Sequence, residues 1–176
     1  MSQVLTPVGS EVLKDIEIVG DTFKHTQQND NECTLLYNPV INKGIVKLEV
    51  QNLQESQMNL CASVEMKFLK KEVGIRSGSI AHIGDRIGGN SGFDDDGSRL
   101  GMELNMESNP RTLTFFINDK EQPNFITNIP NAVRIWCYFS SKFASFKINK
   151  FELLSTPTAR HEKGSRALEY GKEWKK

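Results

Sequence analysis

The stretch RTLTFFINDKEQP, residues 111–123, has the pattern of a buried strand that runs into a tight turn. Successive side chains of a strand point to opposite faces, so Phe115 and Phe116 lie on different sides. Asn118 and Asp119 follow, and both residue types tolerate the left-handed backbone angles that a two-residue hairpin turn requires. We therefore predict a β-hairpin, with Phe115 in the core and Phe116 covered on the other face.

The same period of two recurs along the chain, which indicates many short strands that each have one solvent-exposed face. The clearest segments are GIVKLEV (44–50), LCASVEMKF (60–68), LGMELNM (100–106) and FASFKIN (143–149), with shorter ones at 15–19, 22–26 and 32–37. Turn-forming pairs such as Gly20-Asp21 and Asn109-Pro110 separate them. Helical periodicity is almost absent. We predict an all-β protein, an antiparallel two-sheet β-sandwich.

One further strand, AVRIWCYF at 132–139, is apolar on both faces. If Ile135, Cys137 and their alternate neighbours face the core, Trp136 and Tyr138 point outward. Either a terminal segment covers these two aromatic side chains, or they form an aromatic binding platform.

The composition is typical of one globular domain. The chain has 176 residues, of which 38% are hydrophobic, and its 22 Lys and Arg balance 22 Asp and Glu. A balanced charge creates no field that would attract nucleic acid or an anionic membrane. No signal peptide and no membrane-spanning apolar run is recognisable. We expect a cytoplasmic monomer.

The cysteines indicate reduced thiols rather than a disulfide scaffold or a zinc site. Cys33, Cys61 and Cys137 are odd in number and widely spaced, whereas such sites show even counts or close pairs. We predict no cofactor and no metal site.

The alternating pattern stops after Leu154. We therefore divide the chain into an N-terminal segment (1–14), the β-sandwich (15–154) and a polar tail (155–176). The tail is basic, because from Arg160 onward it has six Lys or Arg and three Glu. Ala167, Tyr170, Gly171 and Trp174 fall at helical spacing, which predicts either a short amphipathic helix or a frayed tail.

Nothing in the sequence marks a catalytic site. His25, His82 and His161 do not have the spacing of metal ligands, and no GxSxG or Cys-His signature is present. We predict that the protein is not an enzyme and has no catalytic residues.

Two glycine-containing motifs invite a ligand-binding interpretation, and neither fits it. IGDRIGGNSG (83–92) lacks the GxxxxGK[ST] pattern of a phosphate loop, so a flexible loop is the better prediction. GFDDDGSRLGME (92–103) has Gly92 at the first ligand position of a calcium loop, and Glu103 belongs to a strand pattern. We interpret it as a solvated acidic loop.

Taken together, the strands resemble the SPRY domain family. The most specific part is GSRLGMELNMESNPRTLTFFINDKEQPNF (97–125), which is similar to the family's glycine-introduced strand, short turn and L-x-F-F-x-N-G hairpin. The resemblance covers roughly residues 15–154. The chain departs from the family pattern at Leu48, Ser98 and Asp119, where tryptophan, aspartate and glycine are frequent, so it resembles a divergent member.

The resemblance implies a non-catalytic protein–protein interaction module, for example a small adaptor, that binds a peptide or protein surface through loops at one end of the sandwich. The connection from Gly74 to Gly97 has seven glycines and should form much of that rim. The candidate partner-binding residues are Arg76, Arg86, Asp94, Asp95, Asp96, Trp136 and Tyr138. The alternative is a carbohydrate-binding, lectin-like sandwich, in which Trp136, Tyr138 and the acidic loop contact the sugar.

Overall fold

The computed structural model describes residues 4–54, 58–63, 73–76, 78–139 and 142–174. These residues form one 3-10 helix, η1 (Glu11–Asp15), and otherwise strands, turns and loops. The strands are β1 (Thr6–Pro7), β2 (Ile16–Val19), β3 (Thr22–His25), β4 (Cys33–Asn38), β5 (Ile45–Gln54), β6 (Met58–Ser63), β7 (Val73–Arg76), β8 (Ser79–His82), β9 (Asp85–Ile87), β10 (Arg99–Asn105), β11 (Thr112–Ile117), β12 (Lys120–Glu121), β13 (Asn124–Thr127), β14 (Arg134–Phe139), β15 (Ser145–Leu154) and β16 (Arg166–Glu169).

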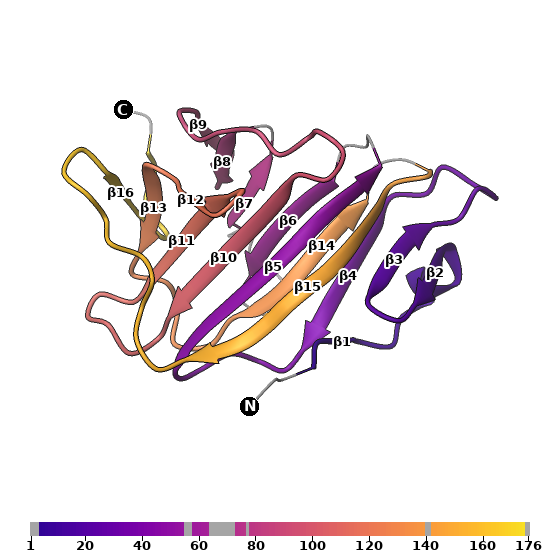
Figure 1. Cartoon of the computed structure of the whole chain (residues 1–176), viewed down its shortest axis with the longest axis horizontal. Coiled ribbons are helices and arrows are strands. Elements are labelled where there is room, and N and C mark those ends of the chain that lie inside the picture. Colours follow the sequence, from indigo (N-terminus) through magenta and orange to yellow (C-terminus); the bar gives the residue numbers. More distant parts are fainter. Residues whose placement is uncertain (1–3, 55–57, 64–72, 77, 140–141, 175–176) are drawn as a thin grey trace.

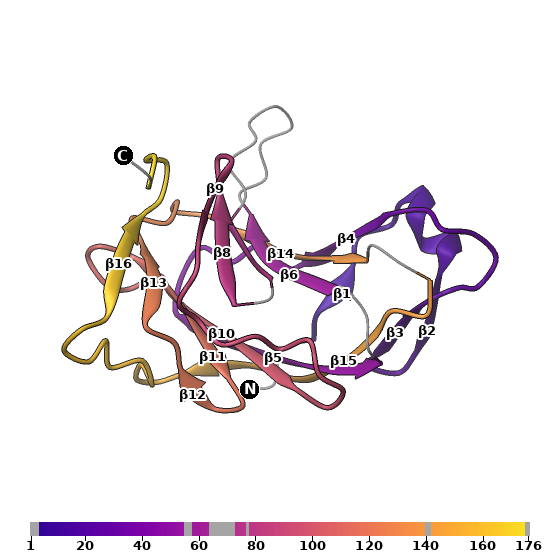
Figure 2. The ribbon, with the colours of Figure 1, turned by 90° about the horizontal axis from the view of Figure 1, so that it is seen from above.

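The strands form two sheets that pack face to face, which confirms the predicted all-β sandwich (Figures 1 and 2). The smaller sheet has the order β1-β4-β14-β6-β7-β8-β9. The larger has the order β16-β13-β11-β10-β5-β15-β3-β2, with β12 paired to β11. Figure 2 shows β4, β6 and β14 in one layer above β5, β10 and β15 in the other. All described strand pairs are antiparallel except β13 and β16.

The predicted hairpin is formed by β11 and β12 of the larger sheet, and β11 also pairs with β10. Met102 of β10 pairs with Phe115 of β11, and both side chains are fully buried between the sheets. Asn118 and Asp119 have φ angles of 49° and 67°, as predicted for the two-residue turn. The core continues through aromatic side chains such as Phe146, whose ring stacks on the rings of Phe23 and Phe139 at centroid distances of 5.2 Å each. Alternation and turn chemistry thus predicted this hairpin correctly.

The outer face of the larger sheet is also covered, as predicted for Phe116. The Nζ atom of Lys47 lies 4.0 Å from the centroid of the Phe116 ring, and Phe116 is only 6% exposed. Gly101 pairs with Phe116, and a Cβ at Gly101 would lie 3.1 Å from the Phe116 Cβ. The glycine therefore leaves room for the ring.

Two predictions are wrong. The described tail contains no helix, because residues 166–169 form β16 instead. This strand forms because the edge of β13 supplies parallel backbone partners, and the spacing of residues in the tail gives no information about that edge. The stretch 83–92 is not simply a flexible loop, since β8 and β9 form a hairpin within the Gly74–Gly97 connection. Asn90 then fixes the loop after β9, where its Oδ1 accepts hydrogen bonds from the backbone and side-chain N–H groups of Asn124 at 3.1 and 3.0 Å.

The strand predicted at 60–68 is described only in part. β6 ends at Ser63, and the remainder of the predicted strand lies outside the described residues. Within the part of the chain that is described, no helix is long and apolar enough to cross a membrane.

Candidate functional site

One end of the sandwich gathers loops from both sheets, and we call it the loop end. It comprises residues 26–32, 93–98, 118–119 and 142–144. These register pairs bring the strand ends together: Gln51 with Arg99, Leu100 with Ile117, Ser145 with Lys24 and with Gln54, and Cys33 with Phe139. Loops at a strand end are free of ladder hydrogen bonds, so this end can change without disturbing the core.

The acidic loop of the loop end has a fixed backbone and exposed carboxylates. Asn52, which is 1% exposed, donates a hydrogen bond from Nδ2 to the carbonyl oxygen of Asp94 at 3.0 Å. The backbone of Asn52 also accepts from Gly97 at 2.8 Å and donates to Ser98 at 2.9 Å. The side chains of residues 94–96 are exposed. The buried amide thus holds the loop so that its three aspartates face solvent.

The turn beside this loop is held by Arg99. Its backbone N–H donates to Oδ1 of Asn118 at 2.9 Å, and its guanidinium forms an ion pair with Asp119. Its Nε lies 3.7 Å from a carboxylate oxygen of Glu49. Arg99 thus faces one carboxylate in the turn and one on β5.

Two large apolar side chains are exposed at the same end. Leu53 is 40% exposed and Phe143 is 39% exposed, and Phe143 has a φ angle of 68°. Both lie beside the pairing of Gln54 with Ser145, which joins the end of β5 to the start of β15. The loop end therefore combines an apolar area with an acidic one.

The remaining loop, residues 26–32, is anchored by two buried polar side chains. Asp15 accepts hydrogen bonds from Nδ2 of Asn29 at 2.7 Å and from Nδ2 of Asn31 at 3.1 Å, and these bonds lower the pKa of its carboxyl. The ring nitrogens of His25 lie 2.7 Å from the carbonyl oxygens of Thr26 and Asn31. The loop is therefore tied to η1 and β3.

The predicted rim residues do not all lie together. Asp94, Asp95 and Asp96 belong to the loop end beside the larger sheet, whereas Arg86 is exposed on β9, an edge strand of the smaller sheet. Arg76 is the last residue of β7, and the structure does not describe its side chain.

Trp136 and Tyr138 lie on the outward face of β14, as predicted. Both are half-buried, while their neighbours Ile135, Cys137 and Phe139 are buried. The indole Nε1 of Trp136 is shielded from solvent and has no hydrogen-bond partner among the residues that the structure describes. This face is therefore less open than a flat stacking platform would be.

The histidines and cysteines have structural surroundings. The Nε2 atom of His82 accepts the backbone N–H of Gly171 at 2.7 Å, and its ring packs against Tyr170 and Trp174. Burial raises the pKa of the thiols of Cys33 and Cys137, so both are poor nucleophiles at neutral pH. Among the described residues, no three His, Cys, Asp or Glu side chains are grouped to hold a metal ion.

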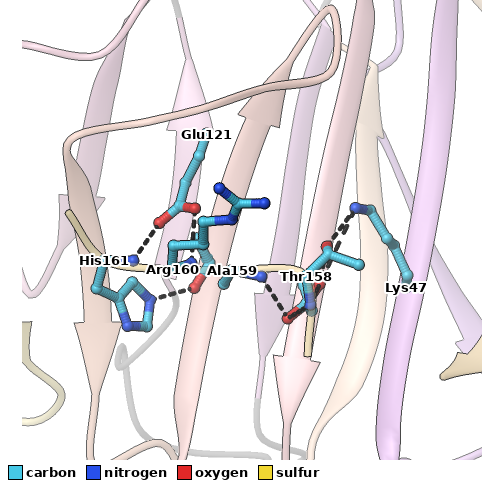
Figure 3. A network of polar contacts seen from close by, with 8 residues as sticks. Lys47, Glu121, Thr158, Ala159, Arg160 and His161 are labelled. Carbon is cyan, nitrogen blue, oxygen red and sulfur yellow. Dashed lines mark hydrogen bonds and ion pairs between the residues drawn. The ribbon is translucent and has the colours of Figure 1, made fainter. Parts of the chain in front are cut away.

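Sequence reasoning missed a network that binds residues 158–161 to the outer face of the larger sheet (Figure 3). The Glu103 carboxylate, 1% exposed, accepts the backbone N–H groups of Thr158 and Ala159 at 3.0 and 3.1 Å. It also accepts the Thr158 hydroxyl, and Lys47 donates to that hydroxyl oxygen at 2.7 Å. An acidic residue at an outward strand position usually suggests only solvent exposure, so no local pattern indicates this role.

A second carboxylate continues the same network. Glu121 accepts the backbone N–H groups of Arg160 and His161 at 2.8 Å each. The His161 ring stacks on Phe125 at a centroid distance of 3.7 Å, and its Nε2 lies 2.8 Å from the Thr114 hydroxyl. Figure 1 shows the chain after β15 crossing the larger sheet before it turns back into β16. Four consecutive backbone donors are thus held by two carboxylates.

The fold has clear counterparts among solved structures. The sequence matches no protein-family model and no curated protein. The SPRY domain of human HERC1 superimposes with a TM-score of 0.60 at 14% identity, covering 78% of this chain and 95% of that chain. A human SPRY domain gives 0.63 at 13% identity, with coverages of 76% and 94%. The PSpry domain of TRIM65 gives 0.61 at 14% identity, with coverages of 83% and 92%. The chain therefore has the SPRY fold that its hairpin and strand pattern resemble.

Proposed function

We propose that this chain is a non-catalytic protein–protein interaction module whose loop end binds a peptide or a protein surface. The observation that supports this most directly is the acidic loop: a buried amide, Asn52, fixes its backbone while three carboxylates face solvent. A preorganised loop loses little conformational entropy on binding, so more of its contact energy contributes to affinity. The SPRY fold, which is generally associated with protein interaction, agrees with this function.

The partner that fits this end carries basic residues beside an apolar side chain. Asp94, Asp95 and Asp96 attract cations, and the exposed side chains of Leu53 and Phe143 offer an apolar contact. Complementary charge steers encounter and selects among partners, whereas apolar burial supplies affinity. Arg76 and Arg86 remain candidates for acidic groups of the same partner, at the border of the smaller sheet. A cytoplasmic adaptor is the setting we propose.

A charge-neutral variant tests this assignment. Asp94→Asn, Asp95→Asn and Asp96→Asn, made together, should weaken partner capture in an affinity purification and leave the melting temperature nearly unchanged. The matched control replaces three exposed glutamates elsewhere, Glu17, Glu152 and Glu173, with glutamine. If the aspartate variant captures the same partners as the control, the site lies elsewhere. Arg76→Ala then tests the border of the smaller sheet, and Trp136 and Tyr138 are the next candidates.

The carbohydrate alternative makes a different prediction. A lectin-like site would use Trp136 and Tyr138 for stacking, so Trp136→Ala would abolish binding on a glycan array. The shielded Nε1 of Trp136 does not favour this role, and the same array should show no binding by the parent protein.

A further inference from the structure

The segment 158–174 is bound by the rest of the domain largely as an extended peptide would be bound. Its backbone N–H groups at 158–161 are held by Glu103 and Glu121, and β16 adds to the edge of β13 from Asn124 to Thr127. Further along, the backbone N–H of Trp174 donates to Asp85 at 2.6 Å. Addition of a strand to a sheet edge, held by main-chain hydrogen bonds, is a general mode of peptide recognition.

A few side chains give the segment its selectivity. The Thr158 hydroxyl bonds to Glu103, the His161 ring stacks on Phe125, and Leu168 is 3% exposed and joins the core. Arg160 and Arg166, by contrast, have exposed side chains. These positions define a motif, in which a hydroxyl residue (158) is followed three positions later by a histidine (161) and then, seven positions after the histidine, by an apolar anchor (168).

The face that receives the segment is built on strands that do not depend on it. Glu103 lies on β10, which is paired along its whole length with β5 and β11. Phe125 lies on β13, which is paired with β11 on its other side. Without the segment, β13 would present unpaired N–H and C=O groups, and such an edge readily pairs with another strand.

The connection between β15 and the segment allows the segment to leave its site. Residues 155–157, which follow β15, are all exposed, and the hydrogen bonds that hold the segment begin at Thr158. The connection can therefore take another path without removing a buried side chain from the core.

We propose that this face is a peptide-binding site that the chain fills with its own residues 158–174, and that the same segment of a second copy fills in exchange. The high effective concentration of the tethered segment favours the intramolecular complex in dilute solution. Exchange of an identical element preserves every contact and joins two copies. The inference is independent of the loop end, since none of the residues that make it up belongs to that site.

A labelled peptide tests the exchange. A synthetic peptide of residues 155–174, carrying a fluorophore at its amino end, is titrated with the full chain and followed by anisotropy. Leu168→Ala in the full chain weakens the tethered segment, so the peptide should bind this variant at least about tenfold more tightly than the parent. The same peptide with Leu168→Asp is the control and should bind neither protein. Equal binding of both peptides, or no binding to the variant, would overturn the proposal.

Two further measurements guard against a folding artefact and test the second copy. Thr158→Val, at an exposed residue, also weakens the tethered segment and should raise peptide affinity if Leu168→Ala fails to fold. Adding Glu103→Gln to either variant should reverse the gain in peptide affinity, because it weakens the receiving face.

Deleting Thr156 and Pro157 shortens the hinge. Short strained hinges promote exchange, so light scattering should detect a dimer at high protein concentration. A monomer at every concentration would overturn the exchange between copies.

Discussion

The carboxylate of Glu103 accepts both the backbone N–H and the hydroxyl of Thr158, 55 residues later in the chain. Glu103 lies on the outer face of the larger sheet, where its side chain would be exposed if residues 158–161 did not cover it. This pair of residues thus helps to connect the outer face of the larger sheet to a segment in which no strand alternation is recognisable.

Glu103→Ala should release this contact and destabilise the fold by about 1.5–3 kcal/mol, the range for hydrogen bonds to a charged group. Thermal unfolding measures the loss, and hydrogen exchange should quicken first at the amides of Thr158 and Ala159. The control is Glu152→Ala, an exposed residue on β15, which should change stability by less than about 0.5 kcal/mol. Unchanged protection at residues 158–159 would contradict the role assigned to Glu103.

Phe115→Ala should cost about 3–5 kcal/mol, because it removes a fully buried aromatic ring from between the sheets. Phe143→Ala is the matched control, since the same ring is removed at a position that is 39% exposed. Urea denaturation of both variants checks the difference. Equal midpoints for the two variants would be inconsistent with the register described for β11.

Two glycines distinguish the free-energy cost of a positive φ angle from the cost of a steric clash with a substituted side chain. Gly78 and Gly84 both have positive φ angles, of 76° and 84°. A Cβ at Gly78 would lie 2.5 Å from the backbone carbonyl oxygen of Asn90, whereas a Cβ at Gly84 meets nothing within 4 Å. Gly84→Ala should therefore cost about 1–2 kcal/mol, and Gly78→Ala about 1–3 kcal/mol more, because the backbone must shift. Similar melting temperatures would show that the loop after β9 moves freely.

Stability should fall in acid partly through Asp15. Hydrogen bonds from Asn29 and Asn31 lower the pKa of its carboxyl in the folded state below the ordinary value of 3.8. The charged form is therefore favoured by folding, so its contribution is present above that value and is lost as the pH falls through the folded pKa. Asp15→Asn should flatten this part of the profile in urea denaturation measured between about pH 2 and 5. The matched control is Asp96→Asn, which removes an exposed carboxylate from the acidic loop.

Folding should not require a metal ion. No group of potential metal ligands occurs among the described residues, and the three adjacent aspartates lie on an exposed loop. The melting temperature should be the same with and without a chelator. A large drop in its presence would show that a cation occupies a site on the chain.

The strands that carry local signals could be predicted from the amino-acid sequence. Alternation in 100–106 and 112–117 predicted β10 and β11, and Asn118-Asp119 predicted their neighbouring turn, because side-chain period and turn angles are properties of a few adjacent residues. It also placed Trp136 outward on β14 for the same reason.

The place of residues 155–174 and the grouping of loops at one end depend on long-range contacts, which the sequence pattern did not predict. The segment 166–169 is a strand because the edge of β13 offers it partners, and its helical spacing in the sequence carries no information about that edge. The acidic loop stands apart from Arg86 because it follows the register of β5 and β10, whereas Arg86 follows the hairpin of β8 and β9. These contacts join residues far apart along the chain, and their energy depends on packing that no local pattern encodes.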